Sequence, residues 1–596
     1  MTLSKTLAGF GVLALVIQLS VAGDNSDTNN QAVTPSLPNG ISSGDTTQTS
    51  TVLWTRSAIT GDVRFQVKGG DGVVLDNTVT VKNPLKPIKI DVDHLASGEK
   101  YTYKVTGLDG QSLKGTFKTA AEPNSDEGLS FGVSGDWRGE LAPYPAIKNV
   151  DSKSLDFFVK LGDTIYADIA SPAVPTGQAR TLAEYRAKHQ EVYTSHIGIN
   201  SFADLQRNVS IFSTIDDHEV INDFAGGTAA ANDPRFSTTT GLVNQTALYK
   251  NGLQAFVEYN AIKNKRYPFT GDNLTDGRPD LYRSQRYGSI AGVYILDARS
   301  FRNQELPGVG NITDPAQIGS FIARSFDAGK TNTRTMLGQK QMAQLKADLL
   351  AAQNDGIIWK FVVLPEPIQN MGVLGASDRY EGYASERSEL LGFIDEQAIK
   401  NVVFIAADIH GTVINDLTYQ RREDVLKALV TSGNPLTAPQ RMTSAFEITT
   451  GSVAFDPAFG DAVTRLLAFV PGGQTVLDQL LASVNVNNLD EFKQLPKTVK
   501  NTAMQALIDQ QLSNLGYTPI GLQDNNLIKA KLKQGSNAAL FSFGWTRFDI
   551  VPESHTLKIT TYGIEPYTVQ NLADNSAEVI SRKPEIVSQL LVSPQY

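Results

Sequence analysis

The sequence predicts a small all-β sandwich followed by a larger α/β domain. Two observations support this prediction: short alternating strands over residues 35–120, and a strand–loop–helix rhythm from residue 129 onward. The 596 residues are enough for two or more domains, at roughly 150 residues per domain. With 41% apolar and 19% charged residues, the composition is that of a globular protein with a large core.

Residues 35–120 contain six short runs with the alternation of half-buried strands. In Tyr101–Val105, for example, apolar and polar residues alternate, and Gly and Asp turns separate such runs. We therefore expect an immunoglobulin- or fibronectin-like sandwich in this region. The segment AEPNSDEG at 121–128 forms the hinge to the next domain.

Over residues 129–596, buried strands alternate with helices, which predicts an α/β layered domain. Helical patterns occur, for example, at 337–353 and 385–398. A helix-rich insertion is expected at 456–536, and a final hairpin at 541–563 should return to a sheet. The expected strands are β-branched or aromatic runs that end in polar residues, at 129–136, 155–163, 209–219, 290–299, 359–366 and 400–410.

The first 22 residues have the pattern of a secretory signal peptide. Lys5 precedes an apolar segment from Leu7 to Leu19, and the small residues Ser20 and Ala22 suit the cleavage site. An uncleaved anchor is the alternative, but the apolar segment is short for a membrane span. We expect a linker at 23–34 and a secreted, periplasmic or extracellular monomer without a membrane span.

The net charge of −9 and the pI of about 5.4 argue against a nucleic-acid-binding protein. The sequence has no basic stripe to neutralise phosphates, so no binding of nucleic-acid duplexes is expected. The chain also has no cysteine, which excludes thiolate catalysis and thiolate metal ligands. A secreted protein without disulfides is stabilised by its core or by bound metal.

Acidic residues and histidines gather at four of the predicted strand ends, where ligands collect in α/β sheets. Only six histidines occur in the chain, yet two of them stand beside a strand-end aspartate. Oxygen and imidazole ligands of this kind predict a two-metal site, which would lower the pKa of a bound water and hold a phosphoryl oxygen. The four motifs are Gly135-Asp136-Trp137-Arg138, Gly162-Asp163 with Tyr166 and Asp168, Asp216-Asp217-His218-Glu219, and Asp408-Ile409-His410.

The order Gly-Asp, Gly-Asp-x-x-Tyr, Asp-Asp-His-Glu, Asp-x-His resembles the calcineurin-like metallophosphoesterases, and within them the PhoD-type alkaline phosphatases. This resemblance covers most of residues 35–416 and the terminal hairpin, and it fades across 456–536. It implies an α+β sandwich metallophosphoesterase core. Further matches are GISSGDTTQTSTVLWTR at 40–56, LDARSFR at 296–302 and SDRYEGYASERSELLGFI at 377–394.

The resemblance implies a first metal ion held by four residues, Asp136, Asp163, Tyr166 and His410. A tyrosine phenolate beside imidazole and two carboxylates suits a hard trivalent ion, so Fe³⁺ is the expected occupant. PhoD-type enzymes usually carry a cysteine ligand in the first motif. This chain has none, and Asp136 is expected to replace it.

A second ion is expected between Asp163, which bridges the two ions, Asp217 and Asp408. In related enzymes histidines commonly complete this site, but Asp408 and Pro365 stand in their places. An all-oxygen site favours Ca²⁺, with Mg²⁺ or Mn²⁺ as alternatives, over zinc.

His218 is the expected acid that protonates the leaving alkoxide or donates to a phosphoryl oxygen, and Glu219 is expected to orient it. Arg138 stands where the family often has a histidine. Arg138 is expected either to pair with a phosphate oxygen or to be a surface arginine. Asp168, Asn222 and Asp223 are candidates for a supporting role around the metals, whereas Asp297, Arg299 and Arg302 are expected to form a structural ion-pair cluster.

Together these features predict a secreted alkaline phosphatase or phosphodiesterase that retrieves phosphate from small esters, through a metal-activated hydroxide at a binuclear or trinuclear site. Two alternatives remain: an inert secreted protein that binds a partner through its β-sandwich, and a phosphodiesterase with phospholipase-D-like activity as its main role. A haloperoxidase-like site would need more histidines, and the acidic charge disfavours a nuclease.

Overall fold

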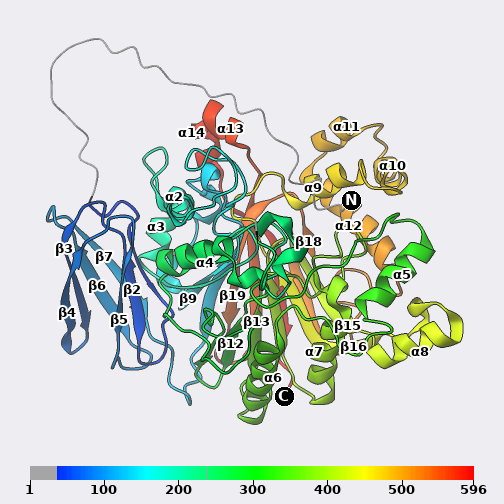
Figure 1. The fold of residues 1–596 in the computed structure, drawn as a ribbon, viewed down its shortest axis with the longest axis horizontal. Helices are drawn as coiled ribbons and strands as arrows, with labels where there is room; N and C mark the ends of the chain where they lie inside the picture. The colour runs from blue at the N-terminus through cyan, green and yellow to red at the C-terminus, as the bar shows by residue number, and fades with distance from the viewer. Residues whose placement is uncertain (1–35, 237) are drawn as a thin grey trace.

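The computed structural model describes residues 36–236 and 238–596, whose strands form three sheets (Figure 1). The expected signal peptide at 1–22 and linker at 23–34 lie outside these residues. Sheet one contains, in spatial order, β17 (Lys529–Gly535), β21 (Glu585–Ser593), β20 (Leu557–Ile564), β19 (Phe543–Ile550), β8 (Leu129–Ser134), β9 (Phe157–Leu161), β10 (Ser210–Thr214), β1 (Ile41–Gly44), β2 (Thr51–Thr55) and β5 (Ile88–Val92). Sheet two contains β11 (Arg283–Tyr287), β12 (Ala291–Ile295), β13 (Trp359–Val363), β14 (Val402–Ala406), β16 (Arg441–Thr449), β15 (Thr412–Tyr419) and β18 (Ala538–Ala539). Sheet three contains β4 (Gly72–Val81), β3 (Gly61–Gly69), β6 (Lys100–Thr106) and β7 (Ser112–Lys118).

The α-helices of the described residues lie between these strands in the chain. They are α2 (Leu182–Tyr193), α3 (Ser201–Gln206), α4 (Ala247–Tyr259), α5 (Pro315–Ser325), α6 (Gln339–Asn354), α7 (Ala384–Glu396), α8 (Arg422–Ser432), α9 (Phe459–Leu467), α10 (Gly473–Ser483), α11 (Leu489–Gln494), α12 (Lys497–Asn514), α13 (Val569–Asp574) and α14 (Ser576–Ser581).

Sheets one and two pack face to face, and their facing side chains form the central core. Phe131 on β8 makes an edge contact with Phe361 on β13, with ring centroids 5.0 Å apart. Phe548 on β19 approaches the same ring at 6.0 Å. Every residue of β9, β10, β13 and β14 is buried. This explains why β14 is a continuous apolar run, and why β9 and β13 are apolar apart from Lys160 and Lys360.

Helices cover the outer face of each large sheet. On sheet one, Tyr185 of α2 and Phe256 of α4 pack in one cluster with Phe158 of β9. On sheet two, α6 and α7 pack against Phe404 of β14 through side chains that include Leu345. The layers therefore run helix, sheet, sheet, helix, and the expected α+β sandwich core is confirmed.

The N-terminal sandwich is confirmed, and one of its two layers continues into the core. Sheet three packs on β1, β2 and β5 around a separate hydrophobic cluster that contains Val63, Phe65 and Tyr103. Strand β1 pairs in parallel with β10, with Ser43 opposite Ser210. The blue strands at one side of Figure 1 are thus joined to the core by a ladder of backbone hydrogen bonds. The domain boundaries at 35–120 and 129–596 stay predictions.

The predicted elements of the core occur where the sequence pattern placed them. The six expected strands correspond to β8, β9, β10, β12, β13 and β14, and the two expected helices correspond to α6 and α7. The final hairpin forms β19 and β20, and β19 pairs with β8 in sheet one. Helices α9 to α12 occupy most of the region 456–536, and they lie on the side of the molecule opposite the sandwich (Figure 1).

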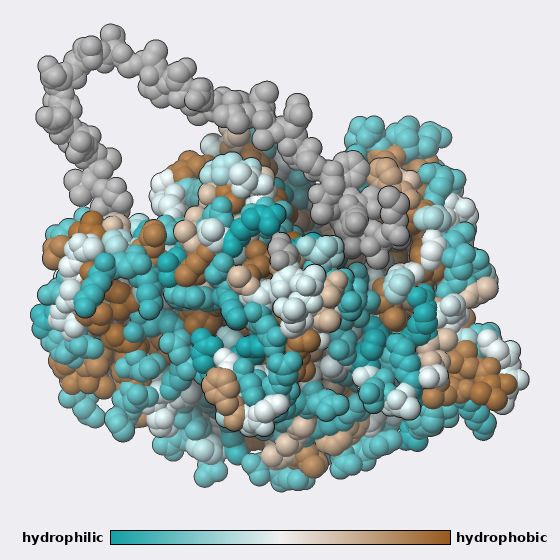
Figure 2. Space-filling model, viewed as in Figure 1, coloured by the Kyte–Doolittle hydropathy of each residue, from teal (hydrophilic) through white to brown (hydrophobic). Residues whose placement is uncertain are grey.

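The visible surface is mixed in polarity, with an apolar area over α8 (Figure 2). That helix carries Val430, whose side chain is 87% exposed. None of the described helices combines the length and the apolar character needed to cross a bilayer.

Strand register brings the candidate residues to one edge of the core. In sheet one, Ser134 of β8 lies opposite Lys160 of β9, and Leu161 of β9 lies opposite Thr214 of β10. In sheet two, Ile295, Val363 and Ile405 are aligned in the same way. The residues that follow these strands therefore meet where the carboxyl ends of both sheets face each other.

Lys160 is buried in β9, three residues before Asp163. Its Nζ hydrogen-bonds the Tyr193 hydroxyl and lies 5.3 Å from the ring centre of Phe202. Burial lowers the pKa of Lys160 to about 7, although the negative charge of Glu219 acts in the opposite direction. The protonated side chain is therefore a source of instability at neutral pH.

We expect Lys160→Met to stabilise the protein most near pH 7. Between the folded pKa of about 7 and the higher unfolded pKa, the unfolded chain binds the extra proton. As the pH rises through this range, the free energy of unfolding of the wild type therefore increases, relative to that of the variant, by about 1.4 kcal/mol per pH unit. Urea unfolding of both proteins at pH 7, 8 and 9 measures this difference. Lys533→Met, an exposed change on β17, is the control, and a pH-independent effect of the Lys160 variant would contradict the prediction.

Candidate metal centre

Sharp backbone turns direct the candidate ligands into the edge between the two sheets. Asp136, Asp163, Asp408 and His410 all have positive φ angles, of 62°, 45°, 65° and 59°. Such left-handed conformations are uncommon outside glycine and tend to occur at functional sites. Asp136, Asp163 and Asp408 come two residues after β8, β9 and β14, and His410 follows Asp408 by two residues, so the turns place these side chains near the strand ends.

The carboxylate of Glu219 holds the turn at Asp163 and the loop that follows β10. Its oxygens accept hydrogen bonds from the backbone N–H groups of Asp163, Thr164 and Asp216, at 3.2, 2.7 and 2.8 Å. The expectation that Glu219 orients His218 is therefore wrong, because these bonds direct the carboxylate to the backbone of the two loops. Burial raises the pKa of Glu219 to about 7.

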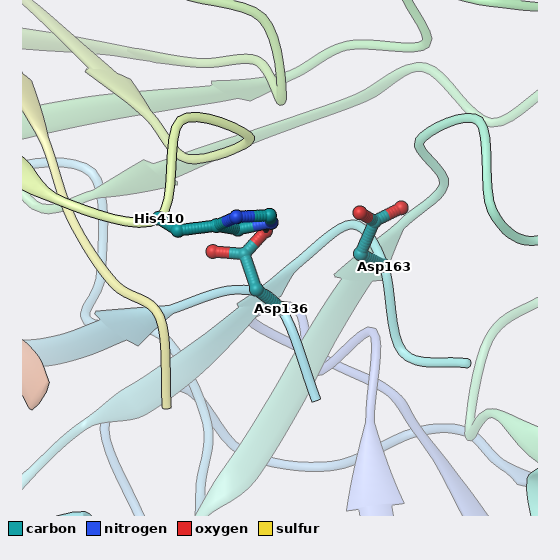
Figure 3. Close-up of side chains that lie close together, drawn as sticks. All are labelled: Asp136, Asp163 and His410. Carbon is teal, nitrogen blue, oxygen red and sulfur yellow. Dashed lines mark ion pairs between the residues drawn. The ribbon is translucent and has the colours of Figure 1, made fainter. Parts of the chain in front are cut away.

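A first ligand group consists of Asp136, Asp163 and His410, which extend from the ends of β8, β9 and β14 (Figure 3). One ligand atom from each residue lies within 4.8 Å of the others. The His410 Nε2 lies 3.9 Å from Asp136 Oδ1 and 3.2 Å from the Tyr166 hydroxyl. The four residues expected at the first ion are thus brought together.

The protonation of this group suits a cation. Burial, with help from the positive charges of His218 and Arg138, lowers the pKa of His410 to about 3, so the imidazole is neutral and keeps a lone pair. Burial and the carboxylates of Asp163 and Asp136 raise the pKa of Tyr166 well above its usual range. A phenolate at Tyr166 would therefore need a strongly charged ion beside it.

A second group joins Asp163 and Asp217 to His218. His218 is held by Asp168, whose Oδ1 lies 2.6 Å from His218 Nδ1. The other Asp168 oxygen accepts the backbone N–H of Asn222 at 2.9 Å. Burial disfavours the imidazolium, but the carboxylates of Asp168, Asp217 and Asp163 outweigh it and raise the pKa of His218 well above its usual range.

Two further carboxylate groups extend the site from the end of β10 toward sheet two. Asp217, Asp223 and Asp378 form one, and Asp378 also belongs to the other, with Glu366 and Asp408. Each group shares a member with the next, so the ligands form a continuous series from His410 to Asp408. Asp408 was expected beside Asp163 and Asp217. In the structure, its carboxylate instead lies within 4.8 Å of ligand atoms of Glu366 and Asp378.

Arg299 is the fixed cation of this series, with a side chain that is 0% exposed. Its Nε donates to Asp216 Oδ1 at 2.6 Å, and it also pairs with Glu366 and with Asp378. Arg302 reaches the same two acids. The expected ion-pair cluster exists, but Asp297 takes part in it through the backbone N–H groups of Arg299 and Ser300 only.

Several buried carboxylate oxygens have no hydrogen-bond donor among the described residues. Both oxygens of Asp136 are in this state, as are one oxygen each of Asp216, Asp217 and Glu366. Burial, and then neighbouring negative charges, raise the pKa values of Asp136, Asp163 and Asp408 well above their usual range. Unpaired buried carboxylates are unfavourable unless a cation binds them, so the residues fit metal ions.

The chain matches two related protein families over adjacent stretches. The PhoD-like phosphatase family matches residues 133–506, and the N-terminal domain of PhoD-like phosphatases matches residues 22–121. The first match covers more than half of the chain and includes every candidate ligand. The chain belongs to the PhoD-like phosphatase family.

One curated relative agrees with this membership, and one solved structure shares the fold. Alkaline phosphatase D of Bacillus subtilis (strain 168) is 27% identical over 417 residues, which are 63% of this chain and 65% of that protein. The chain thus matches slightly less than two thirds of the length of this relative. A solved structure described as "Structure of PhoD" superposes with a TM-score of 0.63, over 96% of this chain and 94% of that one, at 17% identity. The similarity to this solved structure confirms the fold.

Within this PhoD-like centre, several contributing residues were not assigned a role from the sequence. Glu366 follows β13 and could have been found by the strand-end pattern, whereas Asp378 lies in a loop without a strand before it. Phe455 stacks on His410 with ring centroids 3.9 Å apart. The Arg138 guanidinium lies 5.8 Å from the centre of the Phe455 ring and pairs with Glu140 at 3.2 Å.

Gly451 was also missed, and it lies against the first ligand group. Its φ is 117°, and a Cβ at this position would lie 2.7 Å from Asp136 Oδ2. Only glycine combines this conformation with so close an approach to the carboxylate. Gly433, at the end of α8, has a φ of 70° but no atom within 4 Å of such a Cβ.

We expect Gly451→Ala to displace the Asp136 carboxylate and to remove most of the ion bound beside it. Gly433→Ala is the matched control, because it adds the same methyl group at positive φ without a neighbour. Both variants should lose more than about 1 kcal/mol of stability through backbone strain. Elemental analysis of the purified proteins separates them, and equal metal content in the two variants would contradict the role given to Gly451.

Proposed function

We propose that this PhoD-like chain is a secreted, metal-dependent alkaline phosphatase that hydrolyses small phosphate monoesters, and also diesters, for phosphate acquisition. The observation that carries the proposal is the series of buried carboxylates in which Asp163 belongs to two ligand groups at once. The similarity to alkaline phosphatase D of Bacillus subtilis supports the same activity. The signal-like pattern of residues 1–22 supports secretion.

Two or three ions would occupy the centre. Fe³⁺ would be held by Asp136, Asp163, Tyr166 and His410. Ca²⁺, or Mg²⁺ or Mn²⁺ in its place, would be held by oxygen ligands that start at Asp163 and Asp217 and include Asp408. Bound there, the ions would lower the pKa of the attacking water and neutralise charge on the phosphoryl oxygens.

His218 supplies the proton for the leaving group. Asp168 holds its Nδ1, which leaves Nε2 to face the ligands and transfer a proton to the departing ester oxygen. The ring of Tyr166 packs against His218 with centroids 4.4 Å apart and limits its rotation. Arg138 would bind a phosphate oxygen through the guanidinium N–H groups that its contacts with Glu140 and with the Asp456 carbonyl leave free.

The inert binding protein is disfavoured by the same geometry. A site that had lost its chemistry would not be expected to keep its ligands and the groups that hold them. Here the six proposed metal ligands, Asp136, Asp163, Tyr166, Asp217, Asp408 and His410, stand on one edge with supporting contacts from Glu219 and Arg299.

We expect Asp163→Asn to abolish phosphoester hydrolysis and to lower the bound metal by at least one ion per chain, because its carboxylate is shared by two ligand groups. Asp416→Asn is the control, since that buried acid bonds Thr518 and Asn525 outside the centre. Assays of p-nitrophenyl phosphate with and without chelator, together with elemental analysis, measure both effects. Full activity of the Asp163 variant, or hydrolysis that no chelator affects, would rule out this centre.

A separate expectation concerns the Asp168–His218 pair. Asp168→Asn should lower kcat for alkyl phosphates by about 10²-fold, because the alkoxide leaves poorly without a proton. The loss should be much smaller for p-nitrophenyl phosphate, whose phenolate leaves unaided, and the metal content should stay unchanged. Steady-state kinetics with both esters measure the contrast. An equal loss for the two leaving groups would show that Asp168 does not act through proton transfer.

A further inference from the structure

A large hollow of the described surface lies away from the candidate ligands, between the N-terminal domain and the core. Its volume is about 710 Å³, within the range of ligand sites in proteins. One wall is a face of α4 from Tyr249 to Glu258, which is about 14 Å long at the rise of an α-helix. The start of β5 and the segments around 263–266 and 277–281 complete it.

This α4 cleft is strongly basic in a protein with a net charge of −9. Seven of its lining residues are Lys or Arg, and one, Glu258, is acidic. Glu258 does not neutralise the cleft, because Arg186 behind it binds both carboxylate oxygens at 2.7 and 2.9 Å. Two of the seven cations, Lys263 and Lys265, pair with acids at its edge, but the other five form no ion pair within the described structure. Such an excess of positive charge is unfavourable for folding, which indicates that the cleft binds an anion.

Some of the lysines in the cleft bind neighbouring protein groups, whereas others have no partner. Lys89 Nζ donates hydrogen bonds to the carbonyl oxygens of Val257 and Ile262, at 2.7 and 2.8 Å. Lys265 pairs with Asp280. In contrast, the exposed side chains of Lys86 and Lys250 have no hydrogen bond or ion pair within the described structure.

Two arginines add directional donors to the free lysines. Arg266 donates one N–H group to the Gly277 carbonyl oxygen, and Arg278 donates its Nε–H to Asn244 Oδ1 at 3.3 Å. The remaining guanidinium N–H groups of both side chains have no partner among the described residues. Their fork matches the paired oxygens of a phosphate, and lysines on the opposite wall bind such groups as point charges.

We propose that the α4 cleft binds a linear anion with several phosphate groups in series, such as an oligophosphate, at a site separate from the metal centre. The length of the α4 face favours an elongated ligand over a single phosphate. The free donors on Lys86, Lys250, Arg266 and Arg278 come from different walls, so one extended chain of phosphates can contact all of them. The proposal does not depend on hydrolysis at the metal centre.

The test uses the bis-methylene analogue of tripolyphosphate, whose P–C–P linkages resist hydrolysis. Isothermal titration is done with excess orthophosphate, which occupies the metal centre, and at a fixed free calcium concentration. We expect one molecule to bind per chain, and the triple variant K86Q/K250Q/R266Q to bind about tenfold or more weakly. The variant K529Q/K531Q/K533Q removes the same charge from exposed positions on β17 and should bind like the wild type.

Three results would overturn the proposal. The wild type could fail to bind the analogue, or the two triple variants could bind it equally well. A glutamate peptide of the same charge could also bind as tightly as the analogue, which would rule out selection of phosphate. Loss of binding in the first triple variant alone, with unchanged hydrolysis of p-nitrophenyl phosphate, supports a separate site whether or not the metal centre acts as proposed.

Discussion

Mutual repulsion of buried carboxylates is the constraint on which the rest of this structure depends. The carboxyl ends of two sheets meet at one edge and bring Asp136, Asp163, Asp217 and Asp408 into a space from which water is largely excluded. Arg299 offsets part of this charge, but its shorter contacts are with Asp216, Glu366 and Asp378, and of these four carboxylates it pairs only with Asp217, at 3.6 Å. Both carboxylate oxygens of Asp136 lack a hydrogen-bond donor among the described residues, so this portion of the site most needs bound metal.

The strand ends were predictable because the strands before Asp136 and Asp163 are rich in β-branched and aromatic residues, and such segments form strands buried on both faces. The ends of β8, β9 and β10 were located for this reason, as was the layered fold. The sequence did not show which neighbour a side chain meets across a turn. Glu219 follows His218, yet His218 turns to Asp168, fifty positions earlier. Asp378 and Gly451 come from loops whose approach to the site depends on packing between the sheets.

Charge shows the same limit of sequence analysis. The absence of a basic run is correct as a statement about the sequence, but folding gathers cations from residues 86–89, from α4 and from 263–278 into one cleft. These segments are far apart in the chain, and each is unremarkable alone. A net charge of −9 therefore describes the average surface and not its local field.

The parallel pairing of β1 with β10 has a consequence for how this chain can be divided. An accessory domain joined by a linker can be removed without exposing the main chain of its neighbour. Here removal of the N-terminal strands would leave β10 as an open sheet edge, with unpaired N–H and C=O groups next to the turn that carries Asp217. Trp54 of β2 would also leave the helical layer, where its indole N–H bonds the Glu258 carbonyl. The sandwich is therefore part of the scaffold of the metal centre, and the two regions should fold and unfold as one unit.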